Sequence, residues 1–97
     1  MEIADTVFSR ARGLMFRKEP VDMLFVFPGD VRFSIWTPFM FFQIDLFFLD
    51  RDFRVVESRK KLAPWRFYRP KKKYRHLFES EAGKYSDKEV CSLLNKS

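Results

Sequence analysis

The fold is decided by the run FMFFQIDLFFL, residues 39–49, in which large apolar side chains occupy almost every position. Successive side chains of a β-strand point to opposite faces, so alternate residues of this run share a face. The polar side chains of Gln43 and Asp45 lie next to each other on one face, which is otherwise apolar. The run predicts a strand over 39–49 and a mainly β fold. The second face is wholly apolar and consists of Met40, Phe42, Ile44, Leu46 and Phe48.

Apolar runs on both sides of this strand predict further strands. The run 23–27 ends at Pro28-Gly29-Asp30, which is typical of a turn, and a shorter strand is expected over 33–36. After a turn at 50–52 the chain returns as a strand over 53–58, which predicts a hairpin. Residues 74–80 alternate again and predict one more strand.

Helical spacing occurs near both ends of the chain. Asp5 and Thr6 can cap a helix, and the apolar residues after them predict a short helix over 6–16. Near the C-terminus, Ser86 and Glu89 have the spacing of a capping box. The apolar residues that follow fit either a helix or a strand over 90–94, and the sequence leaves both open.

The composition indicates one small globular domain, residues 1–97. Hydrophobic residues make up 46% and charged residues 33% of the chain, and 13 Phe, 2 Trp and 3 Tyr supply large side chains for a core. The single cysteine, Cys91, excludes a disulfide within the chain, as expected in a reducing compartment. The N-terminus lacks a signal-peptide pattern, and the apolar stretch 35–49 is shorter than the ~20 residues that span a bilayer. We therefore expect a cytoplasmic protein.

Ordered motifs extend along most of the chain. They include Arg12-Gly13-Leu14-Met15, Ile44-Asp45, Phe48-Leu49-Asp50, Tyr68-Arg69-Pro70 and Ala82-Gly83. Their order and spacing resemble the prokaryotic family called domain of unknown function 192, or uncharacterised protein family 0127, over about residues 3–94. The resemblance implies a small, largely antiparallel β-barrel or sandwich with one short N-terminal helix, and it implies no established activity. Gln43 departs from the family, which usually has proline at that position.

Positive charge is concentrated in one part of the chain. The net charge is +6, and residues 59–75 contain nine of the 19 Lys and Arg residues and no Asp or Glu. Aromatic residues alternate with these basic residues, and Pro64 and Pro70 each remove a backbone donor, which favours a long loop. The candidate anion-binding residues are Arg59, Lys60, Lys61, Trp65, Arg66, Tyr68, Arg69, Lys71, Lys72 and Lys73.

Basic side chains that contact phosphates, together with aromatic faces for stacking, are what single-strand binding needs. The leading hypothesis is therefore a non-catalytic binding module for an anionic partner, either a nucleic acid or an acidic protein. An anionic membrane surface is a less favoured partner. A solvated loop whose aromatic side chains close the end of a barrel explains the same residues, and the lack of a known nucleic-acid motif favours it.

Asp45 is the second candidate. As a carboxylate among phenylalanines it could act as a general acid or base, and with Glu79 it could form the carboxylate pair of a small hydrolase-like enzyme. The structural interpretation pairs Asp45 with Arg12 or Arg69, since buried charges are normally paired, and treats Gln43 as a second structural polar group. No metal site or cofactor is expected, because one His and one Cys cannot form a zinc site on their own.

Overall fold

Strands and a C-terminal helix make up most of the described chain. The structure is a computed structural model that describes residues 1–4 and 18–95. The predicted helix over 6–16 lies outside these residues, as does Arg12. The mainly β prediction is confirmed. The elements are β1 (Glu2–Ala4), β2 (Met23–Val31), β3 (Ile35–Trp36), β4 (Ile44–Leu49), β5 (Val55–Leu62), β6 (Phe67–Tyr68), β7 (Tyr74–Glu81) and α2 (Asp87–Leu94).

Five of these strands form one sheet in the order β1-β2-β7-β4-β5. The pairs β2–β7, β7–β4 and β4–β5 are antiparallel, but β1 runs parallel to β2, so the sheet is mixed. The prediction of an antiparallel barrel or sandwich is not confirmed in the described residues, where the large sheet is open and ends at β1 on one side and β5 on the other. β3 and β6 form a separate two-stranded sheet, which we call the ribbon.

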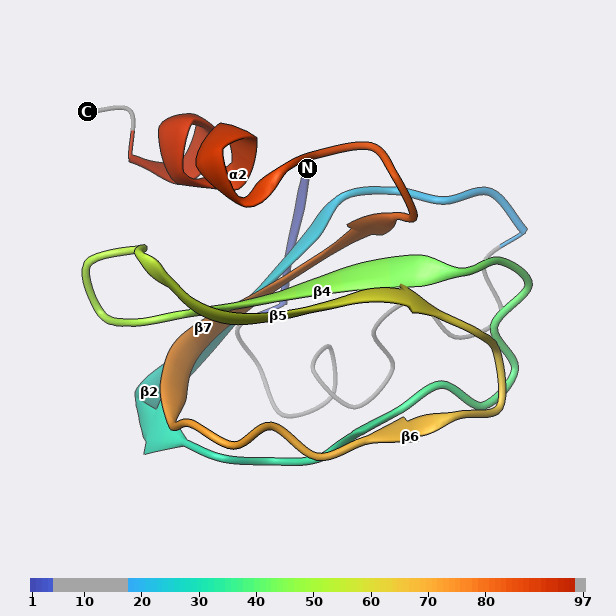
Figure 1. Cartoon of the computed structure of the whole chain (residues 1–97), viewed down its shortest axis with the longest axis horizontal. Helices are drawn as coiled ribbons and strands as arrows, with labels where there is room; N and C mark the ends of the chain where they lie inside the picture. Colours follow the sequence, from blue (N-terminus) through green and yellow to red (C-terminus); the bar gives the residue numbers. More distant parts are fainter. Residues whose placement is uncertain (5–17, 96–97) are drawn as a thin grey trace.

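The ribbon and α2 lie on opposite sides of the large sheet (Figure 1). β4 is buried along its whole length and supplies both sides of the core. Ile44, Leu46 and Phe48 face the ribbon side, whereas Phe47 and Leu49 face the helix side. The predicted apolar face is therefore confirmed. Each such side chain contributes roughly 1.5–3 kcal/mol when fully buried.

Several boundaries differ from the sequence prediction. β2 continues through the expected turn to Val31, and its register with β7 shifts between Val26 and Val31. β4 begins at Ile44 and not at residue 39, and the φ of 57° at Phe39 excludes that residue from a strand. The basic segment is not one long loop, since its ends belong to β5 and β7 and its middle contains β6. Pro64 and Pro70 lie between these strands, where no ladder donor is needed.

The C-terminal alternative is settled in favour of a helix. The Oγ of Ser86 accepts a hydrogen bond from the Glu89 backbone N–H (3.2 Å), and the Ser86 N–H donates to the Glu89 carboxylate (3.0 Å). This capping box starts α2, and Val90 is fully buried against the sheet. Among the described residues, no helix has the length and apolar character that crossing a membrane requires.

The Ser86 cap gives a first prediction. Ser86→Ala removes the acceptor for the Glu89 N–H and should lower the free energy of unfolding by about 1 kcal/mol in urea denaturation. Ser92→Ala, an exposed change on the same helix, is the matched control and should not lower the free energy of unfolding, because Ala has the higher helix propensity. Equal effects of the two changes would contradict the role of the cap.

Candidate binding surface

The ribbon separates its side chains into an inner and an outer pair. Ile35 pairs with Tyr68 and Trp36 with Phe67. Ile35 and Tyr68 pack against the core, whereas Trp36 and Phe67 are 57% and 67% exposed and their ring centroids are 6.4 Å apart. The outer side of the ribbon is therefore aromatic and open to solvent.

Thr37 fixes the loop that follows β3 to the loop that precedes β6. Its side chain is buried, and its Oγ1 donates to the Ala63 carbonyl (2.8 Å) and accepts from the Arg66 N–H (2.9 Å). Its backbone N–H donates to the Arg66 carbonyl (3.0 Å), and its carbonyl accepts from the Trp65 N–H (2.7 Å). Four bonds through one residue make the two loops a single rigid unit.

Phe39 and Trp65 extend the aromatic surface beyond the ribbon. Both have left-handed backbone conformations, with φ of 57° and 60°, which are rare for bulky residues and cost about 1–3 kcal/mol each. Their ring centroids are 4.8 Å apart, and the Trp65 ring lies 6.4 Å from that of Trp36. Both side chains are about half exposed. We call this surface the aromatic face, made up of Trp36, Phe39, Trp65 and Phe67.

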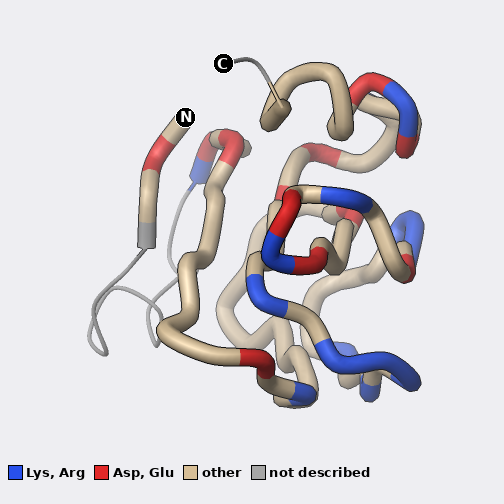
Figure 2. The backbone as a smooth tube through the Cα atoms, turned by 90° about the vertical axis from the view of Figure 1, so that its left-hand side faces the viewer, with Lys and Arg blue, Asp and Glu red and all other residues tan. Residues whose placement is uncertain are grey.

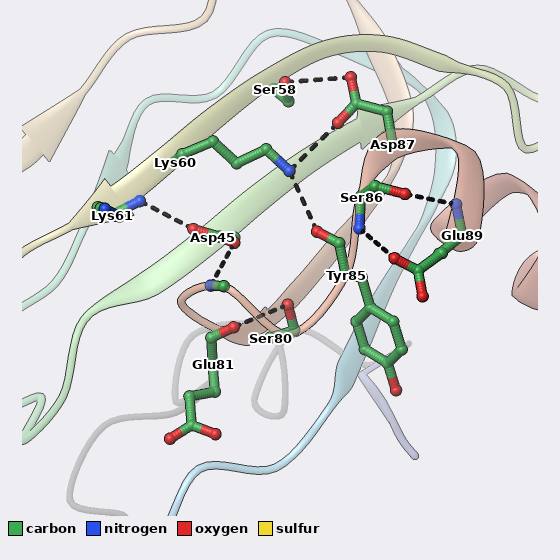
Figure 3. A network of polar contacts seen from close by, with 11 residues as sticks. Asp45, Ser58, Lys60, Lys61, Ser80, Glu81, Tyr85, Ser86, Asp87 and Glu89 are labelled. Atoms are coloured by element: carbon green, nitrogen blue, oxygen red, sulfur yellow. Dashed lines mark hydrogen bonds and ion pairs between the residues drawn. The ribbon is translucent and has the colours of Figure 1, made fainter.

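Lys60 does not belong to this surface. Its Nζ lies 3.3 Å from the Asp87 carboxylate and donates to the Tyr85 carbonyl (3.4 Å), as Figure 3 shows. The same Nζ lies 3.9 Å from the centre of the Phe47 ring. These contacts are on the helix side of the sheet. The sequence interpretation placed Lys60 with the anion-binding residues, and the alternation of β5 turns it to the other face instead.

Tyr68 is also absent from the exposed surface. Its ring packs 5.8 Å from that of Phe48, and its hydroxyl donates to the Glu57 carboxylate. This hydrogen bond, helped by burial, raises the pKa of Tyr68. Tyr68 therefore fastens the ribbon to the core and does not offer a ring for stacking.

Glu57 holds the lysine-rich turn in place. Its carboxylate accepts the backbone N–H of Lys71 (2.9 Å) and of Lys72 (3.0 Å) in addition to the Tyr68 hydroxyl. The lysine side chains are left to point into solvent, and all three lysines of the turn are exposed. Sequence reasoning missed Glu57, because a carboxylate before the basic segment gives no sign of which amides it will accept.

Most of the basic segment has no acidic partner. Arg75 is paired with Asp30 (3.1 Å) and Lys60 with Asp87, but the other basic residues of 59–73 have no carboxylate within 4.0 Å in the part of the chain that the structure describes. All of them are exposed, and blue segments gather along the lower edge of Figure 2 with little red among them. We call these residues the basic rim: Arg59, Lys61, Arg66, Arg69, Lys71, Lys72 and Lys73.

The structure separates the two carboxylates of the enzyme hypothesis. Asp45 pairs with Ser80 across β4 and β7, and the next residue of β4 pairs with Glu79. Paired residues share a face and neighbours alternate, so Asp45 and Glu79 point to opposite sides of the sheet. They cannot act on one bond, and the predicted carboxylate pair is wrong.

Asp45 is held by backbone amides. Its two carboxylate oxygens accept the N–H groups of Lys61 (2.8 Å) and Gly83 (2.9 Å), as Figure 3 shows for the first of these. Arg69 is not its partner. The predicted neighbour Gln43 precedes β4 and is exposed, and its carbonyl accepts from the Ala82 N–H (3.1 Å). Asp45 therefore joins a left-handed residue of β5 to the turn after β7.

Glu79 is a buried acidic residue whose carboxylate has no polar partner in the described chain. It is 5% exposed and faces the ribbon side of the sheet, opposite Met23 on β2 and Leu46 on β4. No hydrogen bond or ion pair to its carboxylate occurs within the described ranges. Burial raises the pKa of Glu79 to about 8. Residues 1–4 and 18–95 contain no group of three His, Cys, Asp or Glu side chains that could hold a metal ion.

Comparison with known sequences gives one family. The family model DUF192, described as an uncharacterized ACR, matches residues 1–92. A UPF0127 protein of Pyrococcus horikoshii is 42% identical over 85 residues, which cover 86% of this chain and 73% of that protein. A UPF0127 protein of Thermococcus sibiricus is 40% identical over 86 residues, which cover 86% of this chain and 55% of that protein.

Two crystal structures share the fold. A protein of unknown function from Novosphingobium aromaticivorans aligns with a TM-score of 0.77 at 24% identity and covers 84% of this chain and 62% of its own. A proposed transcription regulator from Sinorhizobium meliloti aligns with a TM-score of 0.79 at 21% identity and covers 99% of this chain and 74% of its own. At these identities the likeness concerns the fold alone.

Proposed function

This chain belongs to the DUF192 family of uncharacterised proteins, and we propose that it is a non-catalytic binding module whose basic rim holds an anionic partner. The observation that carries the proposal is the set of seven exposed basic side chains without carboxylate partners in the described chain. Uncompensated charge of one sign on one part of a surface attracts polyanions of the opposite sign.

The surroundings of the rim support binding over solvation. Glu57 is the nearest acid along β5, and it is used to position the turn 71–73 through backbone amides. The backbone of the turn is thereby held in place, and Glu57 does so without pairing with a lysine side chain. A loop that is merely solvated has no need of such an anchor, which orders the backbone at an entropic cost.

The alternative of a small enzyme has weaker support. Asp45 is buried and each of its carboxylate oxygens accepts a backbone amide, and Glu79 lies on the other face of the sheet. The suggested role of the Sinorhizobium meliloti protein in transcription is compatible with a basic surface. The proposal does not depend on it, because 21% identity extends to the fold alone.

The basic rim is tested with heparin, a polyanion that has no bases. Replacing Lys71, Lys72 and Lys73 with Ser should weaken binding at low salt at least tenfold. The slope of log Kd against log salt should fall by about 2, since each basic residue that binds the polyanion contributes roughly 0.7–0.9 to this slope. Affinity is measured by isothermal titration calorimetry at several salt concentrations.

The matched control removes the same charge elsewhere. Lys18, Arg51 and Lys88 are exposed and lie outside the basic rim, so their replacement with Ser lowers the net charge equally. Binding that depends on the rim is retained in this control. An equal loss in both variants, or no binding of heparin by the unaltered protein, would overturn the proposed function.

A further inference from the structure

The aromatic face has a composition that an anion-binding surface does not require. Its four residues are all Trp or Phe, and each is between 46% and 67% exposed. An aromatic side chain with about half of its surface exposed rests one side on the protein and presents the other to solvent. The four rings follow one another in the order Phe39, Trp65, Trp36 and Phe67, and together they form a surface for flat, apolar groups.

The aromatic face is also rigid. The four bonds of Thr37 hold the two loops together, and the ribbon pairs Trp36 directly with Phe67. Left-handed conformations at Phe39 and Trp65 persist because this surrounding structure imposes them. A partner that stacks on these rings therefore meets a preformed site and loses little affinity to ordering of the protein.

The basic rim adjoins the aromatic face along the chain. Arg66 stands between Trp65 and Phe67, and Arg69 follows two residues after Phe67, on the same side of the extended chain. Both arginines are exposed, so basic residues of the rim alternate along the chain with exposed rings of the aromatic face. A partner that combines phosphates with exposed planar groups matches both features.

We propose that the aromatic face stacks on the unpaired bases of a single-stranded nucleic acid while the basic rim contacts its phosphates. This inference rests on the proposed function and names the partner. A duplex is a poorer match, because its bases are stacked on one another and its edges are read by elements longer than a two-residue ribbon. An acidic protein offers the charge but no row of planar groups.

A lipid surface is the strongest competing partner, since it also attracts basic and aromatic side chains. Membrane-inserting side chains typically protrude from loops, as Phe39 and Trp65 do, but Trp36 and Phe67 lie on a strand pair with part of each ring against the protein. Leucine keeps an apolar side chain for insertion into lipid but has no planar face on which a base can stack. Leucine substitutions therefore distinguish a lipid partner from a nucleic-acid partner.

Binding is measured with a fluorescein-labelled single-stranded 12-mer of thymidylate by anisotropy. The double variant Trp36→Leu with Phe67→Leu should bind it at least tenfold more weakly, since each stacked base contributes on the order of a five- to hundredfold factor. Trp36→Phe retains a ring and should stay within about threefold of the unaltered protein. Thermal melts establish that each variant is folded.

An abasic 12-mer carries the same phosphates without bases. It should bind the unaltered protein more weakly than the thymidylate strand and be insensitive to the leucine substitutions. Equal binding of the two strands, or no effect of the leucine substitutions on the thymidylate strand, would overturn base stacking. Heparin binding by the basic rim would then stand unaffected, so the two proposals fail separately.

The same variants separate the remaining partners. A 12-base-pair duplex should bind more weakly than the single strand, and vesicles of 30% phosphatidylserine should not bind more tightly than the single strand. Tighter binding to duplex or vesicle that survives the leucine substitutions would assign the surface to that partner and overturn the proposal. The protein's two tryptophans both lie on the aromatic face, so stacking should also quench its intrinsic fluorescence.

Discussion

Glu79→Gln should raise the free energy of unfolding at pH 9 by on the order of 5 kcal/mol and at pH 5 by less than about 1 kcal/mol. Glu79 is buried without a hydrogen-bond partner in the described chain, and its pKa is raised by burial from 4.5 to about 8. Gln has the shape of the protonated acid and never ionises. The variant therefore removes the cost of a buried charge wherever that charge would form.

The direction of the pH dependence follows from proton binding. Between pH 4.5 and about 8 the native state keeps a proton on Glu79 that the unfolded state has released, so stability falls as pH rises through this window. Below pH 4.5 both states are protonated, and above about 8 both are ionised, so the contribution levels off at each end. The magnitude corresponds to about 1.4 kcal/mol for each unit between the two pKa values.

Urea denaturation at pH 5, 7 and 9 measures this effect. Glu81→Gln, an exposed change two residues further along β7, is the matched control and should follow the unaltered protein at every pH. If the unaltered protein and Glu79→Gln show parallel pH profiles, Glu79 does not titrate as its burial requires.

Asp45→Asn should lower the melting temperature by about 10 °C. The carboxylate accepts two backbone N–H groups, and hydrogen bonds to a charged acceptor contribute about 1.5–3 kcal/mol each. The Asn side chain has one acceptor oxygen, and its NH₂ group would face a second donor. A loss of about 2 kcal/mol corresponds to roughly 8–16 °C in a domain of this size.

Differential scanning calorimetry at pH 7 gives the comparison. Asp52→Asn in the turn between β4 and β5 changes an exposed carboxylate in the same way and should shift the melting temperature by less than 2 °C, about the effect of a change of a few tenths of a kcal/mol. A melting temperature of Asp45→Asn equal to that of Asp52→Asn would show that the two amide contacts contribute nothing to stability.

The fold could be predicted to the extent that it depends on local alternation. The run 39–49 identified the buried strand and its apolar face, because a strand that is buried on both sides has apolar residues at nearly every position. The parallel β1 could not be predicted, since Glu2–Ala4 is too short to show a pattern and is placed by its pairing with β2. The capping box at Ser86 identified the start of α2, whereas the choice of helix over strand depended on packing of Val90.

The candidate surface was predictable in its charge and less so in its geometry. The basic residues are contiguous in sequence, so their concentration was visible. The roles of Lys60 and Tyr68 were not visible in the sequence. The face to which each side chain points depends on where its strand begins and ends, and the prolines in this segment hide those boundaries. Trp36 joins Trp65 through the pairing of β3 with β6 and the bonds of Thr37, which link residues about 30 positions apart.

The position of β7 between β2 and β4 determines when this protein can fold during its synthesis. Val26 of β2 pairs with His76 of β7, which the ribosome adds 50 residues later. β4 also pairs with β7, so its second neighbour in the sheet is made equally late. At ~5–20 residues per second, β2 remains without its antiparallel partner for several seconds. The hairpin of β4 and β5 can form early, but the sheet is completed only after β7 has been made. Until then the apolar run of β2 lacks this partner, so conditions that slow translation between β5 and β7 should increase aggregation.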